Sequence, residues 1–184
     1  MARTVRDVVG SHMSPACPER PGPSLERVVP VGENVIRVVP ANEASWEDLQ
    51  LVLGEGDPSR CQCQRFTVGR AQWTAPPVQE RAAMLRSQTR CDQPRSPVMS
   101  GLVAYVGSDP AGCCAVAAQT SYPQVLTGRS PVSWKRRDKD RDDDTLWALT
   151  CFVTRLGFRH RGVSAALVES PSAIGSGSPA GHGS

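Results

Sequence analysis

The residues whose types and spacing best suit a chemical role lie between Thr145 and Glu169, in the segment TLWALTCFVTRLGFRHRGVSAALVE. There an apolar run leads into a basic turn and then into a new apolar segment that begins like a helix. The turn and helix start comprise Arg159, His160, Arg161, Gly162, Val163 and Ser164. Unpaired amides at a helix start form a binding site for phosphate groups, and Gly162 permits close backbone approach. The segment therefore predicts a pyrophosphate site, to which the basic side chains add donors.

A strand over residues 145–153 is predicted to hold this turn in place. Its nearly continuous apolar character is typical of a central strand that is covered on both faces. Earlier, GLVAYV from Gly101 and AGCCAVAAQ from Ala111 flank a Gly-Ser-Asp-Pro turn and predict a β-hairpin. The basic turn thus follows a strand pattern directly, which is the context that a phosphate-binding turn requires.

Two helices are predicted before the hairpin, after a first strand that begins at Asn34 and ends at Pro40. The sequence SWED predicts a capping box, in which Ser45 accepts from the Asp48 amide and the Asp48 side chain returns a hydrogen bond. This first helix is expected to run to about Val52. The second helix is expected over residues 77–88, with Pro77 at its start and one apolar side formed by Val78, Ala82 and Leu85.

Three regions follow from composition. Residues 1–33 contain many prolines and no periodic apolar pattern, so they predict a flexible N-terminal extension. Residues 34–169 carry the strand and helix patterns and predict one folded domain. Residues 170–184 are rich in Gly, Ser and Pro and predict a disordered tail.

The segment CFVTRLGFRHRGVSAAL resembles motif A of the GCN5-related N-acetyltransferase (GNAT) superfamily. That signature has Gln or Arg, two residues, Gly, one residue, and then Gly or Ala; Arg159, Gly162 and Ser164 occupy its positions here. Ser164 replaces the usual small residue, and its hydroxyl is expected to compete for the amide contacts to phosphate. The predicted elements also follow the family order. The resemblance covers about residues 34–169 and implies an α/β fold, with a GNAT-like mixed sheet flanked by helices.

The resemblance implies acetyl transfer from acetyl-CoA, as co-substrate, to an amine that attacks the thioester directly. The acceptor would be a small-molecule or peptide amine. The backbone of Cys151, Phe152 and Val153 would align the pantetheine arm and donate an amide to the thioester oxygen, and residues 159–164 would hold the pyrophosphate. The incoming amine must lose a proton, so a general base is required. Asp144 is our candidate among three successive aspartates, and a solvated acidic turn is the alternative reading.

The family pattern continues with a further strand, a helix and usually two more strands, whereas this sequence continues with the Gly/Ser/Pro tail. We therefore expect the N-terminal half of the fold, from a C-terminally truncated or frame-shifted member. Such a chain would leave the strand over 145–153 with an unpaired edge. A non-enzymatic CoA-binding remnant, or an interaction module, is the alternative function.

Composition argues against several other classes. The formal net charge of +3 is small, and the charged segment KRRDKDRDDD cancels internally, so nucleic-acid binding is not expected. No apolar stretch approaches the length of a membrane span, and no secretory signal is recognised, so we expect a cytoplasmic protein without membrane association. The pairs Cys61 with Cys63 and Cys113 with Cys114 lack the usual zinc spacing, so no metal is expected. The sequence does not indicate an oligomeric state.

Overall fold

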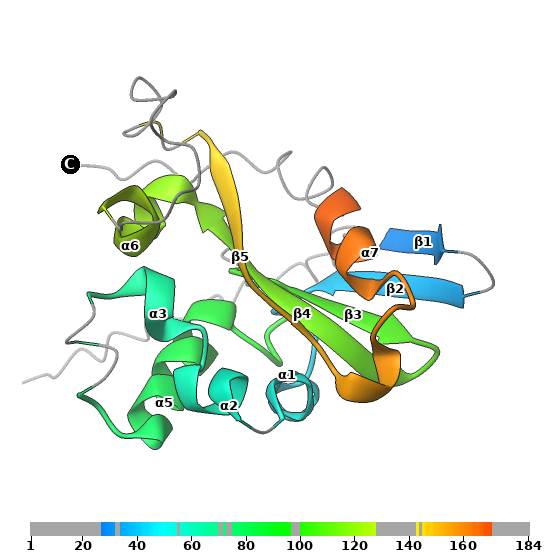
Figure 1. Ribbon diagram of the computed structural model, residues 1–184, viewed down its shortest axis with the longest axis horizontal. Coiled ribbons are helices and arrows are strands. Elements are labelled where there is room, and N and C mark those ends of the chain that lie inside the picture. Colours follow the sequence, from blue (N-terminus) through cyan, green and yellow to red (C-terminus); the bar gives the residue numbers. More distant parts are fainter. Residues whose placement is uncertain are drawn as a thin grey trace, which may run out of the picture.

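The structure is a computed structural model that describes residues 27–31, 34–54, 56–69, 72, 75–96, 100–127, 143 and 145–170. Its described part is a five-stranded sheet with helices on both faces (Figure 1). Chain order and sheet order coincide: β1 (Arg27–Val31), β2 (Asn34–Pro40), β3 (Leu102–Val106), β4 (Asp109–Ala118) and β5 (Trp147–Thr154). The α/β class is confirmed. Every pairing is antiparallel, so the predicted mixed sheet is not seen within the described strands.

Helices occupy the connections between the strands. In chain order they are α1 (Trp46–Leu53), α2 (Asp57–Cys61), α3 (Gln64–Thr67), α5 (Val78–Thr89), α6 (Pro123–Thr127) and α7 (Val163–Glu169). Short 3-10 turns cover Gln119–Ser121 and Leu156–Phe158. Figure 1 shows α1, α2, α3 and α5 on one side of the sheet and α7 on the other.

Alternation along the strands builds a separate core on each face. On β3, Leu102 and Ala104 pack in the cluster with Val163 and Leu167 of α7. The intervening Val103 and Tyr105 belong to the opposite cluster, which contains the buried residues of α1 and Leu85 of α5. Because side chains of a strand point alternately to its two faces, the strand period alone assigns each residue to its core. The sheet is therefore buried on both sides at its centre.

The first described strand begins at Arg27, seven residues before the predicted start of the folded domain at residue 34. Strand β1 pairs antiparallel with β2 from Arg27 opposite Val38 to Val31 opposite Asn34. Pro30 lies inside β1, and proline is tolerated there because β1 is an edge strand whose outer side needs no ladder hydrogen bonds. The rest of the predicted extension and the predicted tail lie outside the described residues.

The strand predicted over residues 145–153 is present as β5, but within the described sheet it is not the central strand covered on both faces that its apolar character predicted; an unpaired edge was expected only for a truncated chain. Strand β5 pairs only with β4 there and stands at the other edge. Six of its eight residues are half-buried and none is fully buried, while Phe152 is 42% exposed and Trp147 is 38% exposed. An apolar strand is expected to pack against other parts of the protein. Its composition does not show whether one face or both faces are covered, or whether the strand lies at an edge of the sheet.

The predicted first helix is confirmed as α1, and its cap is half of the expected capping box. Ser45 Oγ accepts a hydrogen bond from the Asp48 amide at 3.0 Å. The Asp48 carboxylate does not return to Ser45; it accepts from the Tyr105 hydroxyl at 2.9 Å instead. A tertiary partner has thus replaced the local one, and it ties the start of α1 to β3.

The predicted second helix and hairpin are also present, with one change of face. Helix α5 starts after Pro77, but its buried side is formed by Arg81, Leu85 and Thr89, whereas Val78 is exposed. Arg81 is buried because its Nε donates to the Arg60 carbonyl at 2.7 Å. The hydrogen bond of Arg81 therefore helps to set which side of α5 is buried, and a count of apolar residues does not identify that side. The hairpin of β3 and β4 is present, but its turn is shorter than expected: Gly107, with a φ of 62°, and Ser108 form it, whereas Asp109 and Pro110 already belong to β4.

Candidate functional site

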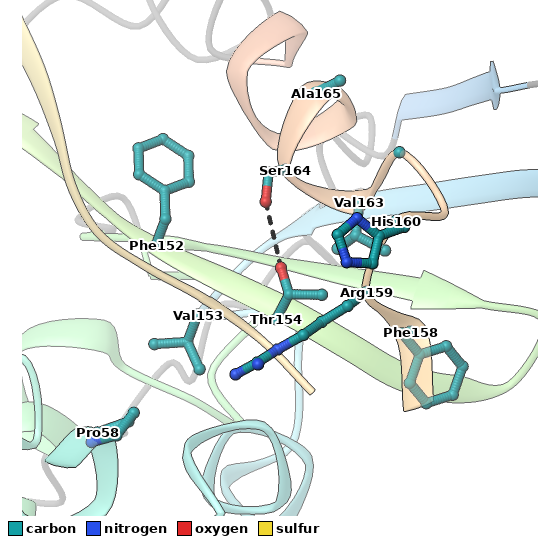
Figure 2. A pocket seen from close by; sticks show the side chains of 11 residues that line it. Pro58, Phe152, Val153, Thr154, Phe158, Arg159, His160, Val163, Ser164 and Ala165 are labelled. Carbon is teal, nitrogen blue, oxygen red and sulfur yellow. Dashed lines mark hydrogen bonds between the residues drawn. The ribbon is translucent and has the colours of Figure 1, made fainter. Parts of the chain in front are cut away.

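A pocket of about 500 Å³ lies where β5, the turn after it and the start of α7 face α2 (Figure 2). Many of the residues singled out by sequence line it: Phe152, Val153, Arg159, His160, Gly162, Val163 and Ser164. The strand, the basic turn and the helix start are therefore brought together around one cavity. The cavity lies beside the edge strand of the described sheet.

The turn places an uncapped helix start at this pocket. Gly162 precedes α7 with a φ of 81°, and no side chain caps the helix. The first helical hydrogen bond runs from the Ala166 amide to the Gly162 carbonyl at 3.0 Å. The amides of residues 163–165 precede that bond, so they are the groups that a helix start leaves without intrahelical acceptors. Val163, Ser164 and Ala165 all line the pocket, so these donors lie at its wall.

Close packing fixes the position of α7 against the sheet. A Cβ atom placed on Gly112 of β4 would lie 2.6 Å from Cγ1 of Val163 and 2.9 Å from the carbonyl oxygen of Val153. The absence of a side chain at Gly112 therefore lets the first residue of α7 sit directly on β4. At the other end of α7, Nη1 of Arg27 donates to the Glu169 carbonyl at 2.6 Å.

The hydroxyl of Ser164 is engaged with the strand. Its Oγ lies 3.2 Å from Oγ1 of Thr154, as the dashed line in Figure 2 shows. The contact links the last residue of β5 to the first turn of α7. We expected this hydroxyl to compete for the amide contacts of a phosphate group; in the structure it bonds to Thr154.

Two arginines of the turn, Arg155 and Arg161, contact the aromatic ring of Phe158. The guanidinium carbons of Arg155 and Arg161 lie 5.3 and 5.6 Å from the centroid of the Phe158 ring, within cation–π range. Arg155 also donates to the Pro110 carbonyl at 2.8 Å. Arg161 is thus held by Phe158 and does not line the pocket, whereas Arg159 does. In Figure 2 the Arg159 side chain extends toward the side of the pocket where Pro58 lies.

Strand β5 carries a bulge beside the pocket. Val153 pairs with Cys113 and Thr150 pairs with Ala115, so two residues of β5, Cys151 and Phe152, stand opposite one residue of β4. Cys151 has a φ of 52°, which is costly for a residue with a side chain. A bulge interrupts the ladder and re-aims neighbouring groups, and bulges are common next to active sites. Phe152 and Val153 point to opposite sides of the strand, as successive strand residues do (Figure 2).

Cys151 itself does not line the pocket; its thiol lies on the α2 and α3 side. Its Sγ donates to the Cys63 carbonyl at 4.0 Å. The candidate base Asp144 lies outside the described residues. Its neighbour Asp143 accepts from both the amide and the hydroxyl of Thr145, at 2.9 and 2.6 Å, and these bonds lower the pKa of its carboxyl. The Asp143 carboxylate therefore stabilises the turn before β5 through these two hydrogen bonds.

Pro58, Thr154, Phe158 and Ala165 also line the pocket and were not among the predicted binding residues. Thr154 and Ala165 directly follow residues that the motif did identify, so a slightly wider motif window includes them. Pro58 comes from α2, far away in sequence, and no local pattern links it to this turn. The sequence analysis predicted no helix between about Val52 and Pro77, where this segment lies.

No helix in the described ranges has the length and apolar character needed to cross a membrane. Among the described side chains, no group of three or more His, Cys, Asp or Glu is placed to hold a metal ion. Comparison with known proteins returned no matching family model, no matching curated protein and no matching solved structure. Any proposal about function therefore rests on the residues of the pocket.

Proposed function

We propose that this chain is an acetyl-CoA-dependent N-acetyltransferase with a GNAT-like fold, and that it acts on a small-molecule or peptide amine. The observation that carries the proposal is the uncapped start of α7, which opens onto a pocket beside the bulged edge strand β5. One wall offers amide donors and Arg159 for phosphate groups. The other wall is an extended strand segment with an interrupted ladder, which suits an extended thioester-bearing chain.

The pyrophosphate of the co-substrate fits the helix end of the pocket. The amides of residues 163–165 act together with the positive end of the helix dipole, and Arg159 adds a fixed positive charge. Gly162 keeps the approach open because it carries no side chain. Thr154 holds Ser164 at 3.2 Å and keeps that hydroxyl directed at the strand.

The bulge of β5 fits the reacting end. The bound thioester supplies the activated acetyl group, whose carbon forms the new bond to the amine nitrogen while the carbon–sulfur bond breaks. In this proposal the backbone at Phe152 and Val153 aligns the pantetheine arm as an added strand would. An amide there donates to the thioester oxygen, which gains negative charge as the amine attacks. Asp144 remains the proposed base.

A second candidate function is CoA binding without turnover. The residues that line the pocket include Arg159 and His160 but no carboxylate, so the described lining offers no acidic side chain as a base. This observation favours a binding protein descended from the same fold. The two candidates agree on the donor site and differ in whether an amine is acetylated.

The test is an acetylation assay with labelled acetyl-CoA and four kinds of acceptor: a polyamine, an aminoglycoside, a peptide with a free N-terminus and a peptide with an internal lysine. We expect labelled product from at least one acceptor, and a loss of roughly tenfold or more in rate at sub-saturating acetyl-CoA for Arg159→Ala. Arg95→Ala removes the same charge from an exposed position away from the pocket and serves as the control. Donor binding without any product would favour the binding protein.

A further inference from the structure

Helix α2 supplies one wall of the pocket although none of its residues is buried. Among the residues that line the pocket, Pro58 comes from this five-residue helix, and Figure 2 shows Val153 of β5 pointing to the side where Pro58 lies. A helix of this length is not stable by itself, and α2 has no buried side chain to hold it against the core. Contacts other than apolar packing must therefore fix the Pro58 wall.

Gln62, the residue directly after α2, makes several of these contacts, and its side chain is buried. Its amide group pairs with that of Gln50 on α1: Nε2 of Gln50 donates to Oε1 of Gln62 at 3.0 Å, and Nε2 of Gln62 donates back to Oε1 of Gln50 at 3.2 Å. The same Nε2 donates to the Ser59 carbonyl at 2.8 Å. The backbone amide of Gln62 donates to the Pro58 carbonyl at 2.9 Å. Gln62 therefore connects α1 directly to the residue that lines the pocket.

The backbone between α2 and α3 also depends on its surroundings. Gln62 and Cys63 have φ values of 48° and 56°, and left-handed backbone is costly for residues with side chains. Two successive residues of this kind persist only where neighbouring contacts hold them. The Cys63 carbonyl accepts from the Cys151 thiol in the bulge of β5 at 4.0 Å. This two-residue connection thus contacts α1 through Gln62 and β5 through Cys63, so it sets the spacing between two walls of the pocket.

A second anchor limits how far α2 moves when the first is lost. Nε of Arg81, on α5, donates to the Arg60 carbonyl in α2 at 2.7 Å. Helix α2 is therefore held from α1 by the amide pair of Gln50 and Gln62, and from α5 by Arg81. Removal of the amide pair alone leaves one anchor in place, so we expect the Pro58 wall to loosen while the rest of the fold stays intact.

We propose that Gln62 is a positioning residue for the pocket: paired with Gln50, it fixes α2 and thereby holds Pro58 opposite Val153. Gln62 acts through Pro58 and does not line the pocket itself. The consequence for acetyl-CoA rests on the proposed function, in which the pantetheine arm runs along β5 on this side of the pocket. A Pro58 wall that is no longer fixed must be ordered when the ligand binds, which lowers the affinity. The positioning of α2 itself does not depend on that function.

A second amide pair in the same region provides a matched control. Gln64 is buried and pairs with Gln88 of α5 in the same reciprocal way, at 2.9 and 3.2 Å. This pair joins α3 to α5, and α3 is not among the elements that supply the described lining of the pocket. Gln50 and Gln88 are both half-buried, and each is the helical partner of a buried glutamine. Substitution of either one therefore removes the same kind of contact, but only Gln50 acts on the Pro58 wall.

The experiment compares Gln50→Ala with Gln88→Ala in the full chain. Calorimetric titration measures the affinity for acetyl-CoA, hydrogen exchange followed by mass spectrometry measures the opening of residues 57–62, and urea unfolding measures stability. We expect similar unfolding midpoints for the two variants, because each loses one amide pair. Only Gln50→Ala should exchange faster in α2 and bind acetyl-CoA more weakly, by roughly three- to tenfold. If Gln50→Ala does not fold, Gln62→Gly replaces it, since glycine adopts the left-handed backbone of residue 62 without strain and lacks the amide group.

The proposal is overturned if exchange in α2 is the same in both variants, or if the chain binds acetyl-CoA and the two variants bind it equally well. In either case, acetyl-CoA binding by the unsubstituted chain leaves the proposed function standing. If the unsubstituted chain binds no acetyl-CoA while Gln50→Ala alone opens α2, the proposed function fails and the positioning of α2 by Gln62 stands.

Discussion

At the scale of single residues, positions without side chains matter as much as chemical groups. Gly112 carries no chemical group and is not part of a recognised motif. It nevertheless allows α7 to contact β4 where Val163 begins the helix. Gly162 was predicted from the motif because its neighbours form a recognisable turn. Gly112 could not be predicted in the same way, because the atoms that crowd it belong to α7 and β5, far along the chain.

The substitution Gly112→Ala is predicted to destabilise the protein by about 1–3 kcal/mol, because the new methyl group overpacks the contact with Val163 and with the Val153 carbonyl. Urea unfolding followed by circular dichroism measures the effect. Gly157→Ala is the matched control, since an added Cβ there has no atom within 4 Å, and its expected effect is below about 0.5 kcal/mol. Equal midpoints for the two variants would contradict the described packing of α7.

The thiol of Cys151, in the bulge of β5, gives a pH prediction at the same scale. Because the pKa of Cys151 is raised to about 12, the thiolate fraction grows with pH throughout the neutral and alkaline range. The initial rate at which Cys151 reacts with oxidised glutathione should therefore rise about tenfold per pH unit between about pH 7 and 10. Stopped aliquots analysed by mass spectrometry give the rate. A rate that levels off near pH 9 would show that the thiol has an ordinary pKa.

At the scale of elements, the parts that follow local rules were predictable and the parts that follow tertiary contacts were not. The hairpin of β3 and β4 could be read from two apolar runs and one glycine turn, and α1 from its serine cap. Helices α2 and α3 were missed. They are held by paired amide contacts, Gln50 with Gln62 at 3.0 Å and Gln64 with Gln88 at 2.9 Å, which join four helices and have no periodic pattern.

The N-cap of α1 provides the prediction at this scale. Ser45→Ala should destabilise the protein by about 1 kcal/mol, because the Asp48 amide loses its acceptor at 3.0 Å. The control is Ser87→Ala, an exposed position inside α5, where the change should lie within about 0.5 kcal/mol. Chemical denaturation of both variants in parallel measures the difference. If Ser45→Ala costs no more than Ser87→Ala, the side-chain cap does not stabilise α1.

At the scale of the whole molecule, the sheet, rather than any one motif, assembles the pocket. Within the described strands, β1 to β5 lie side by side in chain order, and the two helical layers cover opposite faces (Figure 1). The motif identified the strand, turn and helix that meet at the pocket, because these are contiguous in sequence. It did not identify the wall that contains Pro58, because that wall depends on how distant segments pack. An unpaired edge on β5 was expected from the truncation that the resemblance implies, and not from the motif.

The central claim is that the start of α7 and the adjoining strand bind acetyl-CoA. The most direct measurement is calorimetric titration of the reduced chain with acetyl-CoA, beside Arg159→Ala, the double variant Arg159→Ala with Gly162→Glu, and the control Arg95→Ala. We predict saturable binding by the unsubstituted chain and by the control, binding weakened roughly ten- to a hundredfold by Arg159→Ala, and none by the double variant. Folded protein that binds no acetyl-CoA, or binding that is unchanged in the double variant, would contradict the claim.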